Sequence, residues 1–330
     1  MMPKAMLKAV RLDPEEQLVI LDQTLLPGQV AYLVLGDKQS LIEAISALRV
    51  RGAPAIGIAA AYGLFMLAKA YPEQDLPALR RRLLADSREI KGARPTAVNL
   101  AWALERLEQA AADPALCRRE DWLAALKAEA QAIDWEDAAI SRSIARHGLE
   151  LIKPGSGVLT HCNAGGLATS ELGTALAPLY LAHEAGCAFT VYCDETRPLL
   201  QGARLTAFEL QAAGMDPVLI CDNMAAALMA AGKIDLVIVG ADRIARNGDT
   251  ANKIGTLSLA VNAHYFQIPF YVAAPDSTID LSARSGADIV IEQRPGSEIT
   301  SLWYSRPMAP AGVRTLNPAL DRKSTRLNSS

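Results

Sequence analysis

The sequence is short of cysteine and has no excess of positive charge. Its 5 cysteines among 330 residues are an odd number without a CxxC pair: Cys117, Cys162, Cys187, Cys193 and Cys221. This pattern argues against a disulfide framework and a structural zinc site, and a reducing cytoplasm is expected. The formal net charge of −3 argues against a broad basic surface for nucleic acid. If the protein recognises phosphate, we therefore expect small phosphorylated ligands.

Long apolar runs are also lacking. The uncharged segment 52–68 is shorter than the roughly 20 residues that a membrane span requires, and Pro54, Gly57 and Gly63 interrupt it. Its many alanines instead favour a tightly packed core helix. Residues 1–8 contain no apolar core long enough for a signal peptide. We therefore expect a cytoplasmic protein that does not contact membranes.

Helical patterning dominates the first half of the chain. Two strand candidates, 18–21 and 30–35, come first. The predicted helices then cover 40–48, 54–70, 76–85, 96–111 and about 122–152. The last of these is long enough to bridge two domains, and Lys153-Pro154-Gly155 ends it.

Beyond residue 155 short apolar runs alternate with segments of helical length. The runs lie at 158–160, 188–193, 218–221, 236–239, 270–273 and 289–291. This alternation is typical of a parallel sheet covered by helices. We predict an α/β fold with a C-terminal Rossmann-like parallel sheet, helices on both its faces, and a smaller, mainly helical N-terminal domain. The expected boundaries are 1–125 for the helical domain, 126–153 for a linking helix, 154–321 for the Rossmann-like domain and 322–330 for a disordered or artefactual tail.

The most informative segment, GVLTHCNAGG at 157–166, runs from a short apolar strand into a flexible turn. It places Cys162 where the strand ends. The following residues, 169–176, predict a helix start with a hydroxyl at the cap and a carboxylate in the first turn. A strand, a Gly-rich turn and a helix N-terminus form a geometry that holds anions and activates groups. Cys162 is therefore a candidate for chemistry, and the alternative is a small buried apolar residue.

A second cluster follows the apolar run at 236–239. Asp242 comes after small residues there. It can be partly desolvated and so serve as a general acid near neutrality, or it can cap a helix or pair with Arg243. Asn252 and Lys253 are expected to open a helix and bring an amide and an ammonium to its N-terminus, a suitable place for phosphate. The alternative for Lys253 is a solvated side chain.

Two further loops each place an arginine just ahead of a proline that can occupy the first turn of an apolar helix. Arg51 precedes Gly52, Ala53 and Pro54 in one loop, and Arg94 precedes a proline in the other. Guanidinium binds phosphate oxygens bidentately, and Gly52 permits close backbone approach. Both loops are therefore candidate anion sites.

A third loop follows the run at 188–193. Gln201 in this loop can bond a ligand hydroxyl or phosphate. Asp194, Glu195 and Arg197 can simply form an ion network there. The loop therefore adds Gln201 to the candidate binding residues.

Five segments in this order closely resemble the S-methyl-5-thioribose-1-phosphate isomerases, which share a superfamily with the regulatory alpha, beta and delta subunits of translation initiation factor 2B. They are RGAPAIG at 51–57, ARPTAVNL at 93–100, THCNAGGLAT at 160–169, DETRPLLQGARLTAFEL at 194–210 and GADRIARNGDTANKIGT at 240–256. The resemblance covers about residues 6–321. It implies that Cys162 is the catalytic cysteine and Asp242 the catalytic acid. It also implies that the substrate is bound by Arg51, Gly52, Ala53, Arg94, Gln201, Asn252 and Lys253.

The implied reaction converts 5-methylthioribose 1-phosphate to 5-methylthioribulose 1-phosphate in methionine salvage. The 1-phosphate locks the sugar as a furanose, so Asp242 is expected to protonate the ring oxygen as the ring opens. Hydrogen then moves from carbon 2 to carbon 1, either as a proton carried by a Cys162 thiolate that a helix N-terminus favours, or as a direct hydride shift. No cofactor is indicated, because Walker-type, GxGxxG and HExxH patterns are lacking. Family analogy suggests a homodimer.

Two alternatives stay open on the sequence. A related isomerase can act on ribose 1,5-bisphosphate or 5-deoxyribose 1-phosphate, and a regulatory subunit can bind a sugar phosphate or nucleotide without catalysis. The presence of both implied catalytic residues, Cys162 and Asp242, argues against the regulatory alternative. The polar residues 322–330 depart from the family pattern, and loss of a terminal element is expected to weaken stability or dimer packing.

Overall fold

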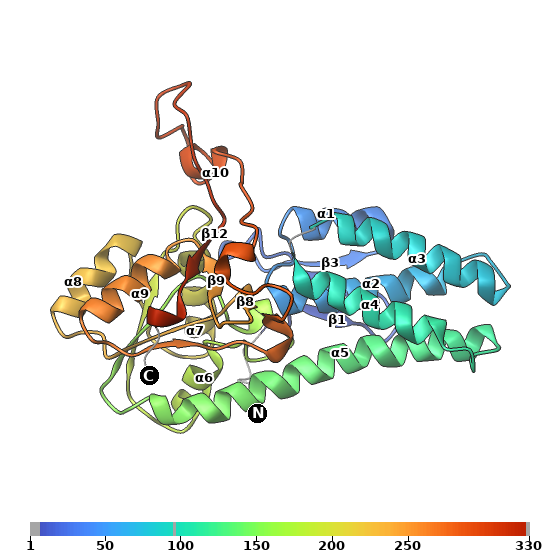
Figure 1. Ribbon diagram of the computed structural model, residues 1–330, viewed down its shortest axis with the longest axis horizontal. Helices are drawn as coiled ribbons and strands as arrows, with labels where there is room; N and C mark the ends of the chain where they lie inside the picture. Colours follow the sequence, from blue (N-terminus) through green and yellow to red (C-terminus); the bar gives the residue numbers. More distant parts are fainter. Residues whose placement is uncertain (1–6, 95–96, 328–330) are drawn as a thin grey trace. The chain divides into compact units, whose positions relative to one another are not determined.

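The computed structural model of the protein describes residues 7–94 and 97–327. Contacts divide the chain into two compact units, one formed by Met1–Ala145 with Ala164–Ala177 and the other by Arg146–Asn163 with Pro178–Ser330. The chain therefore passes from one unit to the other three times (Figure 1). These units differ from the expected boundaries, because most of the long helix and residues 164–177 group with the first unit. No helix in the described residues is long and apolar enough to cross a membrane.

The first unit combines a small antiparallel sheet with helices. The strands β1 (Val10–Leu12), β2 (Leu18–Leu21) and β3 (Tyr32–Leu35) lie in the order β1-β2-β3. The helices are α1 (Lys38–Ser46), α2 (Ala53–Lys69), α3 (Leu76–Gly92), α4 (Val98–Ala112) and α5 (Arg119–Gly148), which continues into the 3-10 turn η1 (Leu149–Leu151). The helical character predicted for this region is confirmed.

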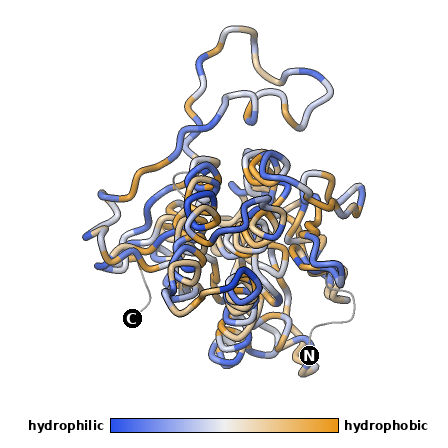
Figure 2. Tube along the Cα trace, turned by 90° about the vertical axis from the view of Figure 1, so that its right-hand side faces the viewer, coloured by the Kyte–Doolittle hydropathy of each residue, from blue (hydrophilic) through white to orange (hydrophobic). Residues whose placement is uncertain are grey.

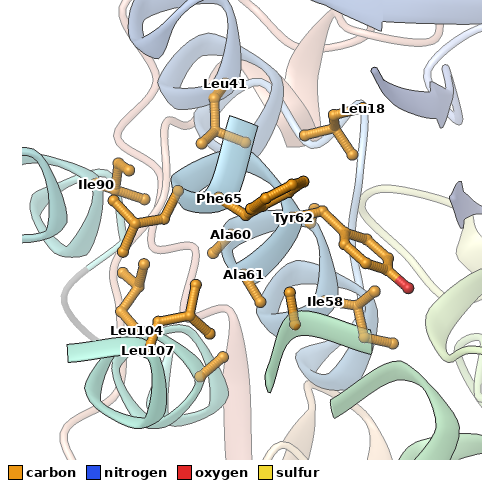
Figure 3. Packing of buried hydrophobic residues seen from close by; sticks show 14 of the residues in the cluster. Leu18, Leu41, Ile58, Ala60, Ala61, Tyr62, Phe65, Ile90, Leu104 and Leu107 are labelled. Carbon is orange, nitrogen blue, oxygen red and sulfur yellow. The ribbon is translucent and has the colours of Figure 1, made fainter. Parts of the chain in front are cut away.

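The uncharged helix α2 forms the centre of this unit's core. All but five of its 17 residues are buried, which confirms the prediction of a core helix rather than a membrane span. Figure 3 shows apolar side chains of neighbouring elements gathered around α2. Along the helices in Figure 2 hydrophilic and hydrophobic residues alternate, as expected where one face of a helix is buried. The side chains labelled around α2 in Figure 3 are Leu18, Leu41, Ile90, Leu104 and Leu107.

The second unit contains a five-stranded parallel sheet in the order β10-β7-β4-β5-β6. Its strands are β4 (Gly157–Thr160), β5 (Thr190–Asp194), β6 (Val218–Ile220), β7 (Leu236–Val239) and β10 (Phe270–Val272). It is flanked by α6 (Ala177–Glu184), α7 (Ala207–Ala212), α8 (Ala225–Ala230) and α9 (Thr256–Tyr265). This confirms the predicted α/β fold. Strand order reverses at β4, whose neighbours are β5 and β7, and ligands of such sheets bind beyond the carboxyl ends of strands at this point.

A second sheet in this unit was not expected from the sequence. Its order is β11-β8-β9-β12, formed by β8 (Arg243–Ala245), β9 (Thr250–Lys253), β11 (Ile279–Asp280) and β12 (Leu320–Lys323). These strands are short and mostly polar, so they lack the apolar runs that mark buried strands. The strand predicted at 289–291 is wrong. Ile289 instead follows a 3-10 turn, η6 (Gly286–Asp288), and packs in a small apolar cluster beside Ala245 and Ala251.

The expectation of an unfolded tail after residue 321 is also wrong as far as residue 327. β12 pairs with β9 through Lys323, and a 3-10 turn, η7 (Thr325–Leu327), follows. The Arg322 guanidinium donates a hydrogen bond of 2.6 Å to the carbonyl of Ile289. Hydrogen bonds to β9 order these polar residues, which have no apolar pattern that would predict a strand. Residues 328–330 lie outside the described residues.

Replacing Lys323 by methionine is expected to stabilise the protein. The side chain is 1% exposed, and its ammonium lies 5.0 Å from the centre of the Phe270 ring. Burial lowers the pKa of Lys323 from 10.5 to about 8, so the charged form is disfavoured in the folded state. The contribution of Lys323 to stability should therefore be lowest below about pH 8 and rise toward about pH 10.5. Lys323→Met should raise the free energy of unfolding at pH 7 by about 1–2 kcal/mol. This value allows for the loss of the favourable contact between the ammonium and the Phe270 ring.

Urea unfolding at pH 7 and at about pH 9.5 measures this effect. The control is Lys233→Met at an exposed position of the same unit, where little change is expected. Equal stability of Lys323→Met and the wild type at pH 7, with the same dependence on pH, would contradict the prediction.

Candidate active site

His161, the residue after β4, is held by two hydrogen bonds. Thr160 pairs with Cys193 in the parallel register, which brings the next residues, His161 and Asp194, side by side. His161 Nδ1 lies 2.8 Å from Asp194 Oδ2, and both side chains are 0% exposed. His161 Nε2 lies 2.8 Å from the carbonyl oxygen of Ile254. Because a carbonyl only accepts, Nε2 carries a proton.

Burial shifts the pKa values of His161 and Asp194 in opposite directions. It alone would lower the pKa of His161, but the hydrogen bond to Asp194 and its negative charge outweigh burial and raise that pKa. Burial raises the pKa of Asp194 to about 6, against the hydrogen bond and charge of His161. Between about pH 6 and the raised pKa of His161 the pair therefore holds a carboxylate and an imidazolium, which share the proton at Nδ1.

The backbone of Cys162 is fixed on both sides by threonine hydroxyls. Its φ of 64° lies in the left-handed region, which is uncommon for a residue with a side chain. The Cys162 N–H donates to Thr196 Oγ1 at 2.8 Å, and Thr206 Oγ1 donates to the Cys162 carbonyl at 2.6 Å. Cys162 is partly exposed. These contacts favour a positioned, accessible thiol over the alternative of a buried apolar residue.

Thr196 is itself anchored by two aspartates. Its φ is 66°, its N–H donates to Asp222 Oδ1 at 2.7 Å, and its hydroxyl donates to the carbonyl of Asp194 at 3.0 Å. Asp222 Oδ2 also accepts from the backbone N–H of Arg197 at 2.7 Å. The ends of β4 and β5 are therefore joined through one network of hydrogen bonds.

The helix start expected at residues 169–176 is wrong. The chain instead forms a 3-10 turn, η2 (Gly166–Ala168), followed by bends, and α6 begins only at Ala177. Backbone groups of this segment bond to α5: the Ser170 N–H donates to Asp137 at 2.6 Å and the Leu172 N–H to Ser141 at 3.1 Å. These tertiary bonds replace the helical ones. The activation of Cys162 by a following helix N-terminus is therefore not supported.

Asp242 occupies the turn between β7 and β8. Its N–H donates to the carbonyl of Ala251 at 3.0 Å. Its side chain is exposed, so the expected desolvation is wrong; the turn that carries it is open to solvent. The neighbouring Arg243 lies 3.4 Å from Asp280. As an exposed carboxylic acid at the end of β7, Asp242 remains available to a ligand.

Asn252 and Lys253 end the strand β9 rather than open a helix. Gly255, with a φ of 107°, caps the following α9. The N–H groups of Gly255 and Leu257 donate to the Asp321 carboxyl at 2.7 and 3.0 Å. This helix N-terminus is therefore capped by a carboxylate instead of standing open for phosphate, which corrects the expected arrangement. The Lys253 ammonium donates to the carbonyl of Ala319 at 2.9 Å.

Gln201 is 5% exposed and directly precedes a π-helical turn, η3 (Gly202–Thr206). Such turns are frequent at functional sites. Its side-chain oxygen has no hydrogen-bond partner within the described part of the chain. A buried acceptor of this kind favours a ligand donor.

The remaining predicted binding residues belong to the first unit. Gly52 caps α2 with a φ of 89°, and a Cβ there would lie 2.5 Å from the Ala168 side chain, so a larger residue does not fit. Pro54 lies in the first turn of α2, as predicted. Arg94 follows α3, while Pro95 and Thr96 lie outside the described residues, and α4 begins at Val98. The candidate residues thus fall in both units.

One group in residues 7–94 and 97–327 has the composition of a metal site. The ligand atoms of His161, Asp194 and Asp222 lie within 4.8 Å of one another. Hydrogen bonds already engage both ring nitrogens and both oxygens of Asp222. The geometry therefore favours a shared proton over a metal ion.

The roles of His161, Thr196, Thr206 and Asp222 were not recognised in the sequence. For His161 a signal was available. Pairing the predicted strands 158–160 and 188–193 end to end in parallel places His161 beside Asp194, which follows the second run. No comparable signal marks the threonines, because their contacts depend on the backbone of the loops.

The reversal of strand order at β4, with polar groups beyond β4, β5 and β7, defines a ligand-binding α/β protein of Rossmann-like architecture. The sequence profile of the Initiation factor 2 subunit family matches residues 49–327, and the chain belongs to this family.

Two relatives and one solved structure are similar over nearly the whole chain. The methylthioribose-1-phosphate isomerase of Symbiobacterium thermophilum is 53% identical over 325 residues, which cover 97% of this chain and 89% of the relative. The 5-deoxyribose 1-phosphate isomerase of Petrotoga mobilis is 51% identical over 307 residues, covering 93% and 88%. The crystal structure of 5-methylthioribose 1-phosphate isomerase from Pyrococcus horikoshii OT3 matches with a TM-score of 0.91 at 37% identity, covering 99% of this chain and 92% of that one.

Proposed function

We propose that the protein is an aldose-ketose isomerase, an intramolecular oxidoreductase that converts 5-methylthioribose 1-phosphate to 5-methylthioribulose 1-phosphate in methionine salvage. The main support is the position of Cys162 at the end of β4, where hydrogen bonds with Thr196 and Thr206 hold its backbone in a left-handed conformation. The relatives named methylthioribose-1-phosphate isomerase support the same substrate. Turnover of this sugar phosphate by the purified protein is the direct test.

Ring opening precedes the isomerisation. Because the 1-phosphate blocks spontaneous opening, a proton must reach the ring oxygen as its bond to carbon 1 breaks. Asp242 lies exposed at the end of β7, and it donates that proton once bound substrate excludes water from its carboxyl group. Arg51, Gly52, Ala53, Arg94, Gln201, Asn252 and Lys253 bind the substrate, the arginines and Lys253 through its phosphate.

Isomerisation in deuterated water should give a product without solvent deuterium at carbon 1. The turn of Cys162 leads into a 3-10 turn and bends, so no α-helix N-terminus follows directly to favour a thiolate that abstracts the proton at carbon 2. Hydrogen then shifts with its electron pair from carbon 2 to carbon 1, and the hydroxyl at carbon 2 gives its proton to the Asp242 carboxylate that ring opening has left. Cys162 shapes the site in which the hydride moves. Mass spectrometry of the product measures this, and deuterium at carbon 1 would instead assign proton transfer through Cys162.

The group at carbon 5 is the main alternative for the substrate. A relative that is 51% identical is named 5-deoxyribose 1-phosphate isomerase, and this observation favours 5-deoxyribose 1-phosphate as the second candidate. Ribose 1,5-bisphosphate carries a second dianion at carbon 5 and serves as the contrasting substrate. The highest kcat/KM among the three identifies the substrate, whereas binding without turnover of any would indicate a regulatory subunit.

A cytoplasmic homodimer completes the proposal. None of the five cysteines forms a disulfide in the described part of the chain, and this is consistent with a reducing compartment. Exposed apolar side chains lie on the edge strand β6 and on α9, and either element can contribute to a contact with a second copy: Val218, Leu219, Val261 and Tyr265 are 40, 50, 50 and 78% exposed. Light scattering of the purified protein measures the oligomeric state, and a monomer at micromolar concentration would contradict the dimer.

A further inference from the structure

The imidazole of His161 joins three segments of the second unit. It follows β4 directly, donates from Nδ1 to the Asp194 carboxylate at the end of β5, and donates from Nε2 to the carbonyl of Ile254 beyond β9. Ile254 directly follows Asn252 and Lys253, and His161 directly precedes Cys162. One buried ring therefore links the turn of the cysteine to the loop of two proposed binding residues.

The backbone of Gly255 packs closely against the ring of His161. A Cβ on Gly255 would lie 2.7 Å from Cε1 and 2.8 Å from Nε2 of His161, and Gly255 has a φ of 107°. Glycine at this position thus allows the backbone to pack directly against the imidazole. The charged groups that act on the ring are Asp194 on β5, Asp222 beyond β6 and Asp321 on β12, and Lys253 acts on Asp321 in turn. Three carboxyl groups around the ring favour its protonated form.

We infer that His161 is a positioning residue for the proposed isomerase: its ring, which shares one proton with Asp194, holds the turn of Cys162 against the end of β9, which carries Asn252 and Lys253. Both hydrogen bonds require that proton. Without it, the lone pair of Nδ1 faces the Asp194 carboxylate at 2.8 Å, and the two groups repel. The ring then leaves Asp194 or Ile254, and the two segments separate.

Activity should fall as pH rises through the raised pKa of His161. Burial lowers the pKa of His161, but Asp194 raises it more, so the net shift is upward. For a group with a raised pKa in the folded state, stabilisation is complete below the ordinary value of 6.5 and disappears as pH rises through the raised pKa. The activity should therefore fall across that range together with the contact.

Asp194→Asn separates this role from a merely structural one. The asparagine amide donates to a neutral Nδ1, while Nε2 still donates to Ile254, so both hydrogen bonds persist without a shared proton. We expect the variant to lose the alkaline fall in kcat that the wild type shows. His161→Phe fills the space without either hydrogen bond, and should lower kcat about 10²-fold, as small misplacements of reacting groups do. Identical pH profiles for the wild type and Asp194→Asn would overturn the inference.

The kinetic test rests on the proposed function. A second measurement, the protonation state of the histidine rings, does not depend on turnover. The chain has 4 histidines, so nitrogen NMR of histidine-labelled protein can follow each ring. We expect one ring with both nitrogens protonated at pH 6.5 that loses a proton only as pH rises through its raised pKa, and a ring with a single proton in Asp194→Asn. A His161 ring that is singly protonated at pH 6.5 in the wild type would overturn the proposed role even if no substrate is turned over. Stoichiometric Zn²⁺ binding that needs both His161 and Asp194 would overturn it in favour of a metal site.

Discussion

Asp242→Asn should lower the turnover of 5-methylthioribose 1-phosphate by about 10²–10⁴-fold, the range that a positioned group contributes by acid-base catalysis. Cys162→Ser should lower it by about 10²-fold, because Cys162 shapes the site in which the hydride moves. Serine keeps the backbone contacts with Thr196 and Thr206 but replaces the sulfur by a smaller, more polar oxygen. Asparagine preserves the shape of Asp242, but its amide is too weakly acidic to transfer a proton to the ring oxygen. The measurement is kcat and KM for each variant. We expect the loss mainly in kcat, because both groups act as bonds change.

Cys187→Ser is the matched control for the cysteine. Cys187 is partly exposed and lies in the same unit, before β5, so the substitution makes the same chemical change away from the proposed site. Its kcat should equal that of the wild type. If Cys162→Ser also keeps the wild-type kcat while all proteins show the same circular dichroism spectrum, Cys162 has no role in the reaction.

The ends of the parallel strands could be predicted from the sequence because buried strands consist of apolar runs. The runs at 158–160 and 236–239 predict β4 and β7 closely, and with them the places of Cys162 and Asp242. The lack of charge over 52–68 likewise predicts the buried α2. In these segments local composition and burial agree, so the pattern in the chain is also the pattern in the fold.

Tertiary contacts decided the segments that the sequence did not predict. The segment 169–176 has the residue types of a helix start. The backbone N–H of Ser170 instead donates a hydrogen bond to Asp137, which lies far away in the sequence. The carboxyl of Asp321 occupies the N-terminus of α9 in the same way. The short polar strands of the second sheet depend on pairing with one another. No local pattern encodes such contacts.

Gly202→Ala should destabilise the second unit by about 3 kcal/mol, near the upper end of the usual cost of overpacking. A Cβ on Gly202 would lie 1.6 Å from the carbonyl oxygen of Asp194 and 3.0 Å from Thr196 Oγ1. The first contact is with the backbone of β5, which is paired to both β4 and β6, so no side chain can move aside to relieve it. Urea unfolding followed by circular dichroism measures the loss.

The same substitution should lower the activity of the protein that stays folded. Relief of the contact requires η3 and the end of β5 to separate, and this displaces Thr196, whose hydroxyl accepts from the Cys162 N–H. We expect kcat to fall about 10²-fold under conditions where the variant is fully folded. Gly92→Ala is the control: a Cβ there meets nothing within 4 Å at the end of α3, so stability should be equal or slightly higher. Wild-type kcat in folded Gly202→Ala would mean that the position of Thr196 does not govern Cys162.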